Sequence, residues 1–111
     1  MKETILALLV ALRAVESANG TDLRAGGNDL QITPVCVADV NRIYGTSYTI
    51  EDTKDRRRSE EIAVLYLSYW WPRCKNDPDA ETFARIWNRG PSKWKDVKGR
   101  KYWKKVRRKI K

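Results

Sequence analysis

The stretch KETILALLVALRAVES, residues 2–17, decides the fold of this chain. Its apolar residues recur every three or four positions, which is the spacing of one buried face on an α-helix. The residues that share this face are Ile5, Leu8, Leu9, Leu12, Val15 and Glu16. We therefore expect an amphipathic first helix that ends at Ser17, before the turn pair Asn19-Gly20.

The same stretch has a second interpretation as a signal peptide, because a charged start precedes the apolar run 5–12. Glu3 is unusual in such a start, and no small-x-small cleavage site follows at the right distance. The spacing therefore favours the helix. The run is also too short to span a bilayer, so no transmembrane segment is expected.

Four more helices are expected where similar apolar spacing lies between residues that begin or end helices. They cover residues 34–44, 59–69, a segment from 76–78 to 88, and 101–110. Pro34 suits the first turn of its helix, Ser59 is the expected N-cap of the next, and Pro72 marks the end of that helix.

The connecting segments are polar. Residues 21–29 are expected to form a loop, with a pinched hairpin as the alternative, and residues 91–99 a second loop. Residues 48–50 are expected to be briefly extended. The sequence thus predicts one compact, mainly α domain over residues 1–111, with a minimal or vestigial β region.

The composition excludes several kinds of chemistry. The formal net charge is +9 and histidine is absent, which rules out a Ser-His-Asp triad, a His-ligated zinc site and a histidine pH switch. Acid–base catalysis must then rest on a carboxyl group, and no cofactor or metal is expected. Cys36 and Cys74 are too few for a disulfide scaffold, and free thiols are favoured over a single bridge. The five Trp and five Tyr suit a sugar or nucleobase site, with ordinary packing as the alternative.

Three short segments carry the candidate chemistry. They are AVES at 14–17, LQITP at 30–34 and ARIWNRGP at 84–91. In order and character they resemble the lysozyme-like superfamily, in particular its soluble lytic transglycosylase and goose-type lysozyme branch. Small phage-encoded lysozyme-like domains are the most similar. The resemblance covers nearly the whole chain, and it implies a lysozyme-like α+β fold with a substrate cleft.

The resemblance also implies an activity, which is cleavage of the β-1,4 bond between N-acetylmuramic acid and N-acetylglucosamine in peptidoglycan strands. Glu16 would protonate the leaving oxygen. Water would attack in a lysozyme, and the muramic C6 hydroxyl in a lytic transglycosylase. Ser17, Gln31, Trp87 and Asn88 would bind the substrate, with Trp87 in the place of the family's Tyr and Asn88 in the place of its Asn. The chain would act in the bacterial cell wall or periplasm.

Glu16 has a physical case of its own. A carboxyl at the end of an apolar helix face is poorly solvated, and the negative end of the helix dipole disfavours its charge. Both effects keep a proton available near neutral pH, as a glycosidic acid requires. Taken alone, however, Glu16 is more typical of a solvated glutamate in a last helical turn.

The segment between Glu16 and Gln31 departs from the family. It is short, and the Gly that normally precedes Leu-Gln is replaced by Asn28-Asp29. Asp22 and Asp29 are the carboxylates inside it. Either is a candidate for holding a water molecule opposite the acid, as an inverting hydrolase requires.

Two other functions stay open. In residues 93–111, Lys and Arg alternate with Trp94, Tyr102 and Trp103, a pattern typical of nucleic-acid-binding modules. A lysozyme-like domain that binds glycan without cutting it is the other alternative. The same charge suits an anionic cell-wall surface, so no dedicated nucleic-acid partner is expected, and the chain is expected to be a monomer.

Overall fold

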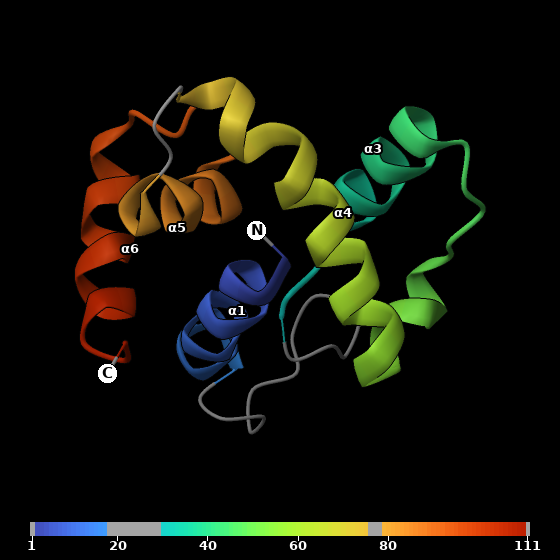
Figure 1. The fold of residues 1–111 in the computed structure, drawn as a ribbon, viewed down its shortest axis with the longest axis horizontal. Coiled ribbons are helices and arrows are strands. Elements are labelled where there is room, and N and C mark those ends of the chain that lie inside the picture. Colours follow the sequence, from blue (N-terminus) through green and yellow to red (C-terminus); the bar gives the residue numbers. More distant parts are fainter. Residues whose placement is uncertain (1, 18–29, 76–78, 111) are drawn as a thin grey trace.

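Helices make up most of the described chain, which comprises residues 2–17, 30–75 and 79–110 of a computed structural model. The elements are α1 (Lys2–Ser17), α3 (Pro34–Tyr44), the short 3-10 helix η1 (Ile50–Lys54), α4 (Arg56–Cys74), α5 (Ala80–Arg89) and α6 (Val97–Arg107), as Figure 1 shows. No strand occurs within these ranges. The prediction of a mainly α chain is therefore confirmed, whereas the loop expected at 21–29 lies outside the described residues.

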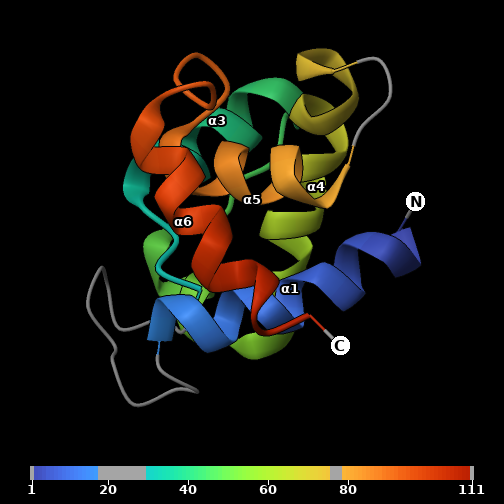
Figure 2. The ribbon, with the colours of Figure 1, turned by 90° about the vertical axis from the view of Figure 1, so that its left-hand side faces the viewer.

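The core forms where α1 packs against α4 and α6, and where α5 packs against α4 and α6 (Figures 1 and 2). Ile5, Leu9 and Leu12 of the predicted face are buried there. The other large, fully buried side chains are Leu30, Ile32, Val40, Ile62, Leu67, Phe83, Ile86 and Val106. Residues 30–33 run from beside α1 to the start of α3, so Leu30 and Ile32 enter this core just before the helix begins (Figure 2).

Helix α3 has the predicted boundaries because both of its ends are capped. The Thr33 side chain accepts a hydrogen bond from the Cys36 amide over 3.2 Å, and Pro34 takes a first-turn position that needs no N–H. Gly45 ends the helix in the left-handed conformation, with φ of 68°.

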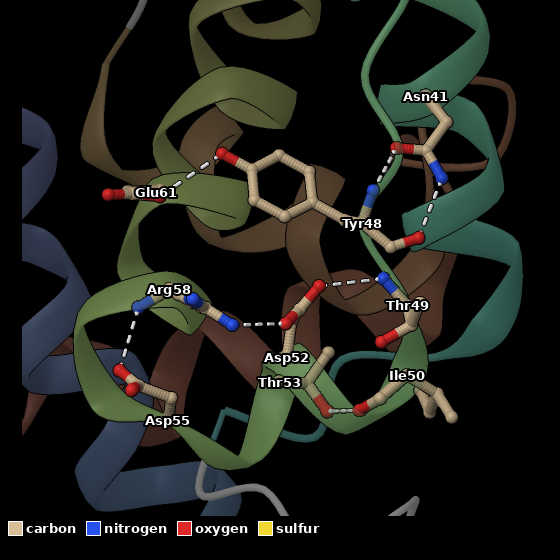
Figure 3. Close-up of polar contacts among 9 residues, drawn as sticks. All are labelled: Asn41, Tyr48, Thr49, Ile50, Asp52, Thr53, Asp55, Arg58 and Glu61. Carbon is tan, nitrogen blue, oxygen red and sulfur yellow. Dashed lines mark hydrogen bonds and ion pairs between the residues drawn. The ribbon is translucent and has the colours of Figure 1, made fainter.

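The connection from α3 to α4 is held by side chains (Figure 3). The Asn41 amide donates to the Tyr48 carbonyl and accepts from the Tyr48 amide, both over 2.9 Å. The Tyr48 hydroxyl donates to Glu61 over 3.1 Å. These bonds fix residue 48 in place, but the extended segment expected at 48–50 is shorter than predicted, because Ile50 already begins η1.

Helix α4 begins earlier and ends later than the sequence predicts. Asp55 caps it by accepting from the Arg58 amide over 3.1 Å, so the expected N-cap Ser59 lies inside the helix, buried, and donates to the Arg56 carbonyl. Pro72 also lies inside, because a proline near a helix end removes only one backbone bond.

Helix α6 begins at Val97 rather than at residue 101, with Asp96 as its N-cap, bonded to the Lys98 amide over 2.9 Å. Much of the predicted loop 91–99 is therefore a turn followed by helix. Within the described ranges, no helix is both long and apolar enough to cross a membrane.

Candidate functional site

A cavity of about 510 Å³ opens between α3, α4 and the end of α5. It is lined by residues 31–33, 35, 36 and 39 around α3, by Tyr66 and Trp70 of α4, and by residues 87–93 after and at the end of α5. This volume is in the range of small-ligand sites.

Three of the sequence-predicted site residues, Gln31, Trp87 and Asn88, line this cavity together. The Trp87 indole nitrogen donates to the Leu30 carbonyl over 3.3 Å, which joins two segments that are 57 residues apart. The Trp87 ring also meets the Tyr66 ring edge-on, with 6.0 Å between centroids. Trp87 therefore both lines the cavity and packs against another aromatic side chain.

Gln31 has a backbone φ of 56°, a value that residues other than glycine rarely adopt. It lies between the buried residues Leu30 and Ile32, whose packing holds it there. Strain of this kind costs about 1 kcal/mol or more and is frequent at functional sites. The conformation places the Gln31 side chain in the lining of the cavity instead of the core.

Asp39 supplies the one carboxylate among the described residues of the lining. It accepts a hydrogen bond from the Trp70 indole over 2.8 Å and an ion pair from Arg42. The sequence analysis did not select Asp39, because an Asp-Arg pair three residues apart on a helix is typical of a solvated surface.

Arg85 fixes the loop that forms one wall of the cavity. Only 9% of the residue is exposed, and its guanidinium donates to the Trp94 carbonyl over 2.8 Å and to the Asp96 carbonyl over 3.3 Å. Glu81 balances its charge over 2.9 Å. Arg85 belongs to the candidate segment 84–91. Its role in positioning the loop does not follow from the sequence, because the carbonyls that it binds lie just before α6, which begins at Val97.

Glu16 does not line this cavity. It is partly exposed in the last turn of α1, near Tyr102 of α6. Burial raises the pKa of the Tyr102 phenol, and the negative charge of Glu16 raises it further. The side chain of Ser17, and both Asp22 and Asp29, lie outside the described residues.

The two cysteines are free thiols near the cavity, as the sequence analysis favoured. Cys36 lines it, and burial, together with the charge of Asp39, raises the pKa of Cys36 to about 12. The Cys74 sulfur contacts the Pro91 carbonyl over 3.7 Å. Both groups are poor nucleophiles and metal ligands in this state.

The geometry combines aromatic walls, two amide side chains and one carboxylate, with the candidate acid in a separate position. In the described part of the chain, no group of three or more Cys, Asp or Glu side chains is placed to hold a metal ion. No family model, curated protein or solved structure matches this chain.

Proposed function

We propose that this chain is a lysozyme-like glycosidase that binds peptidoglycan strands in the cavity and cleaves them with Glu16 as the acid. The observation that carries the proposal is the meeting of Gln31, Trp87 and Asn88 in one cavity. These residues were selected from two short segments far apart in the sequence.

The lining suits a sugar. Apolar faces of pyranose rings pack on aromatic side chains, which Tyr66, Trp70 and Trp87 provide. The amides of Gln31 and Asn88 can each donate and accept, which matches hydroxyl and N-acetyl groups.

Glu16 would donate its proton to the glycosidic oxygen as the bond to the leaving sugar breaks. In a lytic transglycosylase its carboxylate would then take the proton of the muramic C6 hydroxyl as that oxygen attacks. In an inverting hydrolase, water would attack from the opposite face and give its proton to a second carboxylate. Glu16 lies in the last turn of α1, at the negative end of the helix dipole.

The exposed side of α6 supports attachment to an anionic cell wall. Six of its side chains are exposed cations: Lys98, Arg100, Lys101, Lys104, Lys105 and Arg107. Such a surface attracts polyanions at long range. We place the action of this domain, as a monomer, in the bacterial cell wall or periplasm.

A second candidate is a domain that binds glycan without cutting it. One observation favours it, namely that Glu16 is not among the described residues of the cavity lining. A sugar seated in the cavity would have to extend beyond the described lining to reach Glu16, and a domain in which strands do not extend that far would only bind.

The test is lysis of purified peptidoglycan by the wild type, by Glu16→Gln and by Glu51→Gln, a matched change at an exposed glutamate of η1. Loss of a general acid is expected to slow lysis by about 10²- to 10⁴-fold. Glu51→Gln should lyse normally. Mass spectrometry of the products distinguishes anhydro ends from reducing ends.

If Glu16→Gln lyses peptidoglycan at the wild-type rate, Glu16 is not the acid. Glycan binding without lysis by the wild type, lost in Trp87→Ala, would establish the second candidate instead.

A further inference from the structure

The charges around the cavity are unequal. The lining residues that the structure describes include one carboxylate, Asp39, and two cations, Arg89 and Lys93. The carboxylate is matched by Arg42, and Arg89 is matched by Asp96 over 3.3 Å. Lys93 is exposed and has no ion pair within the described part of the chain. Among the described residues, the lining therefore offers one positive charge that no carboxylate pairs with.

The backbone at Lys93 is held in position although its side chain is long. Its amide donates to the Gly90 carbonyl over 3.3 Å, and its carbonyl accepts from the Asp96 amide over 3.0 Å. Arg85 fixes the Trp94 and Asp96 carbonyls that follow. The backbone of Lys93 is therefore fixed beside the cavity, in the loop that follows Asn88, and the ammonium group is attached to it by a flexible side chain.

We propose that Lys93 is a specificity-determining residue that selects a sugar bearing a carboxylate over an uncharged one. In a peptidoglycan strand this group is the lactyl carboxylate of muramic acid, free or continued as a stem peptide. A carboxylate beside the cavity would meet the exposed ammonium group of Lys93, while its sugar ring packs on Trp87 and Tyr66. The inference rests on the proposed glycan site, and it adds the charge class of the ligand.

The experiment compares two tetrasaccharides of equal length by calorimetry in low salt. One is uncharged chitotetraose, and the other alternates N-acetylglucosamine with N-acetylmuramic acid. All proteins carry Glu16→Gln so that the ligands stay intact. Both ligands are titrated into three proteins: Glu16→Gln alone, Glu16→Gln with Lys93→Gln, and Glu16→Gln with Lys98→Gln. Lys98 is an exposed cation of α6 that does not line the cavity.

We expect the muramic ligand to bind about two- to fivefold more tightly than chitotetraose, the range of a solvent-screened ion pair. Lys93→Gln should abolish this preference, whereas Lys98→Gln should preserve it. A methyl ester of the lactyl group should bind like chitotetraose.

Three results would overturn the inference. They are equal affinity for both ligands in the parent protein, a preference that survives Lys93→Gln, and an equal loss in Lys98→Gln, which would assign the effect to overall charge. In each case binding of chitotetraose leaves the proposed glycan site standing. Binding of neither ligand would overturn both the site and the inference.

Discussion

The indole nitrogen of Trp87 donates to the carbonyl oxygen of Leu30 over 3.3 Å. This bond joins the end of α5 to the segment that carries Gln31, and it does so beneath the cavity that both segments line. A contact between residues so distant in sequence fixes the width of the site. The spacing between the Gln31 and Trp87 segments thus depends on this hydrogen bond and on the packing of Trp87 against Tyr66.

We expect Trp87→Phe to destabilise the chain by about 1–2 kcal/mol, because it leaves the carbonyl of the buried Leu30 without this donor. Glycan affinity should also fall in this variant, because the hydrogen bond between the end of α5 and the Leu30 segment is lost. Urea unfolding and calorimetry with chitotetraose measure the two effects. Trp103→Phe, a partly exposed indole that does not line the cavity, is the control and should bind normally. An unchanged free energy of unfolding in Trp87→Phe would show that this hydrogen bond does not stabilise the chain.

Gln31 allows strain and function to be separated. We expect Gln31→Gly to be more stable than Gln31→Ala by about 1 kcal/mol, because glycine alone adopts a φ of 56° without steric cost. Both variants lack the amide and should bind glycan equally weakly. Thermal unfolding and glycan titration of the pair provide the measurement, and an alanine variant as stable as the glycine one would contradict the strain.

Helix ends could be predicted from the sequence where a single capping residue was available. Thr33 and Gly45 bracket α3 as expected. For α4, the sequence predicts Ser59 as the N-cap, because Glu60 and Glu61 would then lie near the positive end of the helix. The cap is the earlier residue Asp55. Tertiary contacts, including the Arg58 ion pair with Asp52, decide for the earlier one.

The site was predictable only where a motif marked it. Gln31, Trp87 and Asn88 stand in segments that the family resemblance singles out, and they do line one cavity. Asp39 belongs to no motif, and Lys93 stands in the basic pattern of residues 93–111 instead of in one of the three segments of the candidate site. Their place in the lining follows from how α3 and the loop after α5 pack, which spacing along the chain does not encode.

Gly99 is expected to resist substitution although it lies in a helix. Alanine would gain about 1 kcal/mol of helix propensity. Its Cβ, however, would stand 3.1 Å from the Trp94 carbonyl and 3.3 Å from the Arg85 side chain. The hydrogen bond between these two groups prevents either from moving away. Gly99→Ala should therefore lose about 1–2 kcal/mol in urea unfolding, while Arg100→Ala, at an exposed neighbour, stays within about 0.5 kcal/mol of wild type.

Cys36 is expected to be nearly inert in the folded chain. Burial and then the charge of Asp39 raise the pKa of Cys36 to about 12, against 9.0 for an ordinary thiol. The thiolate fraction at pH 8 should fall about a thousandfold. Labelling of Cys36 by a disulfide reagent, followed in Cys74→Ser, should be correspondingly slow, and Asp39→Asn should speed it. Native labelling as fast as labelling in urea would contradict this burial.

Asp79 links stability to pH at the start of α5. Burial opposes its charge, but hydrogen bonds from the Lys75 ammonium and from Thr82 outweigh it and lower the pKa of Asp79 to about 2, from 3.8. A carboxyl whose pKa is lower in the folded state stabilises the fold above the unfolded value. That contribution is lost as the pH falls from 3.8 towards 2.

Denaturant unfolding of wild type and Asp79→Asn across pH 2 to 7 measures this contribution. Asparagine keeps the cap and removes the charge, so the difference isolates the ionised carboxylate. About half of the side chain is exposed, at 48%, and solvent screens its pair with Lys75. We therefore expect a difference of about 0.5–1 kcal/mol at pH 7 that disappears by pH 2. Lys75→Gln should reduce the same difference, and a gap that stays constant with pH would show that Asp79 acts through its shape alone.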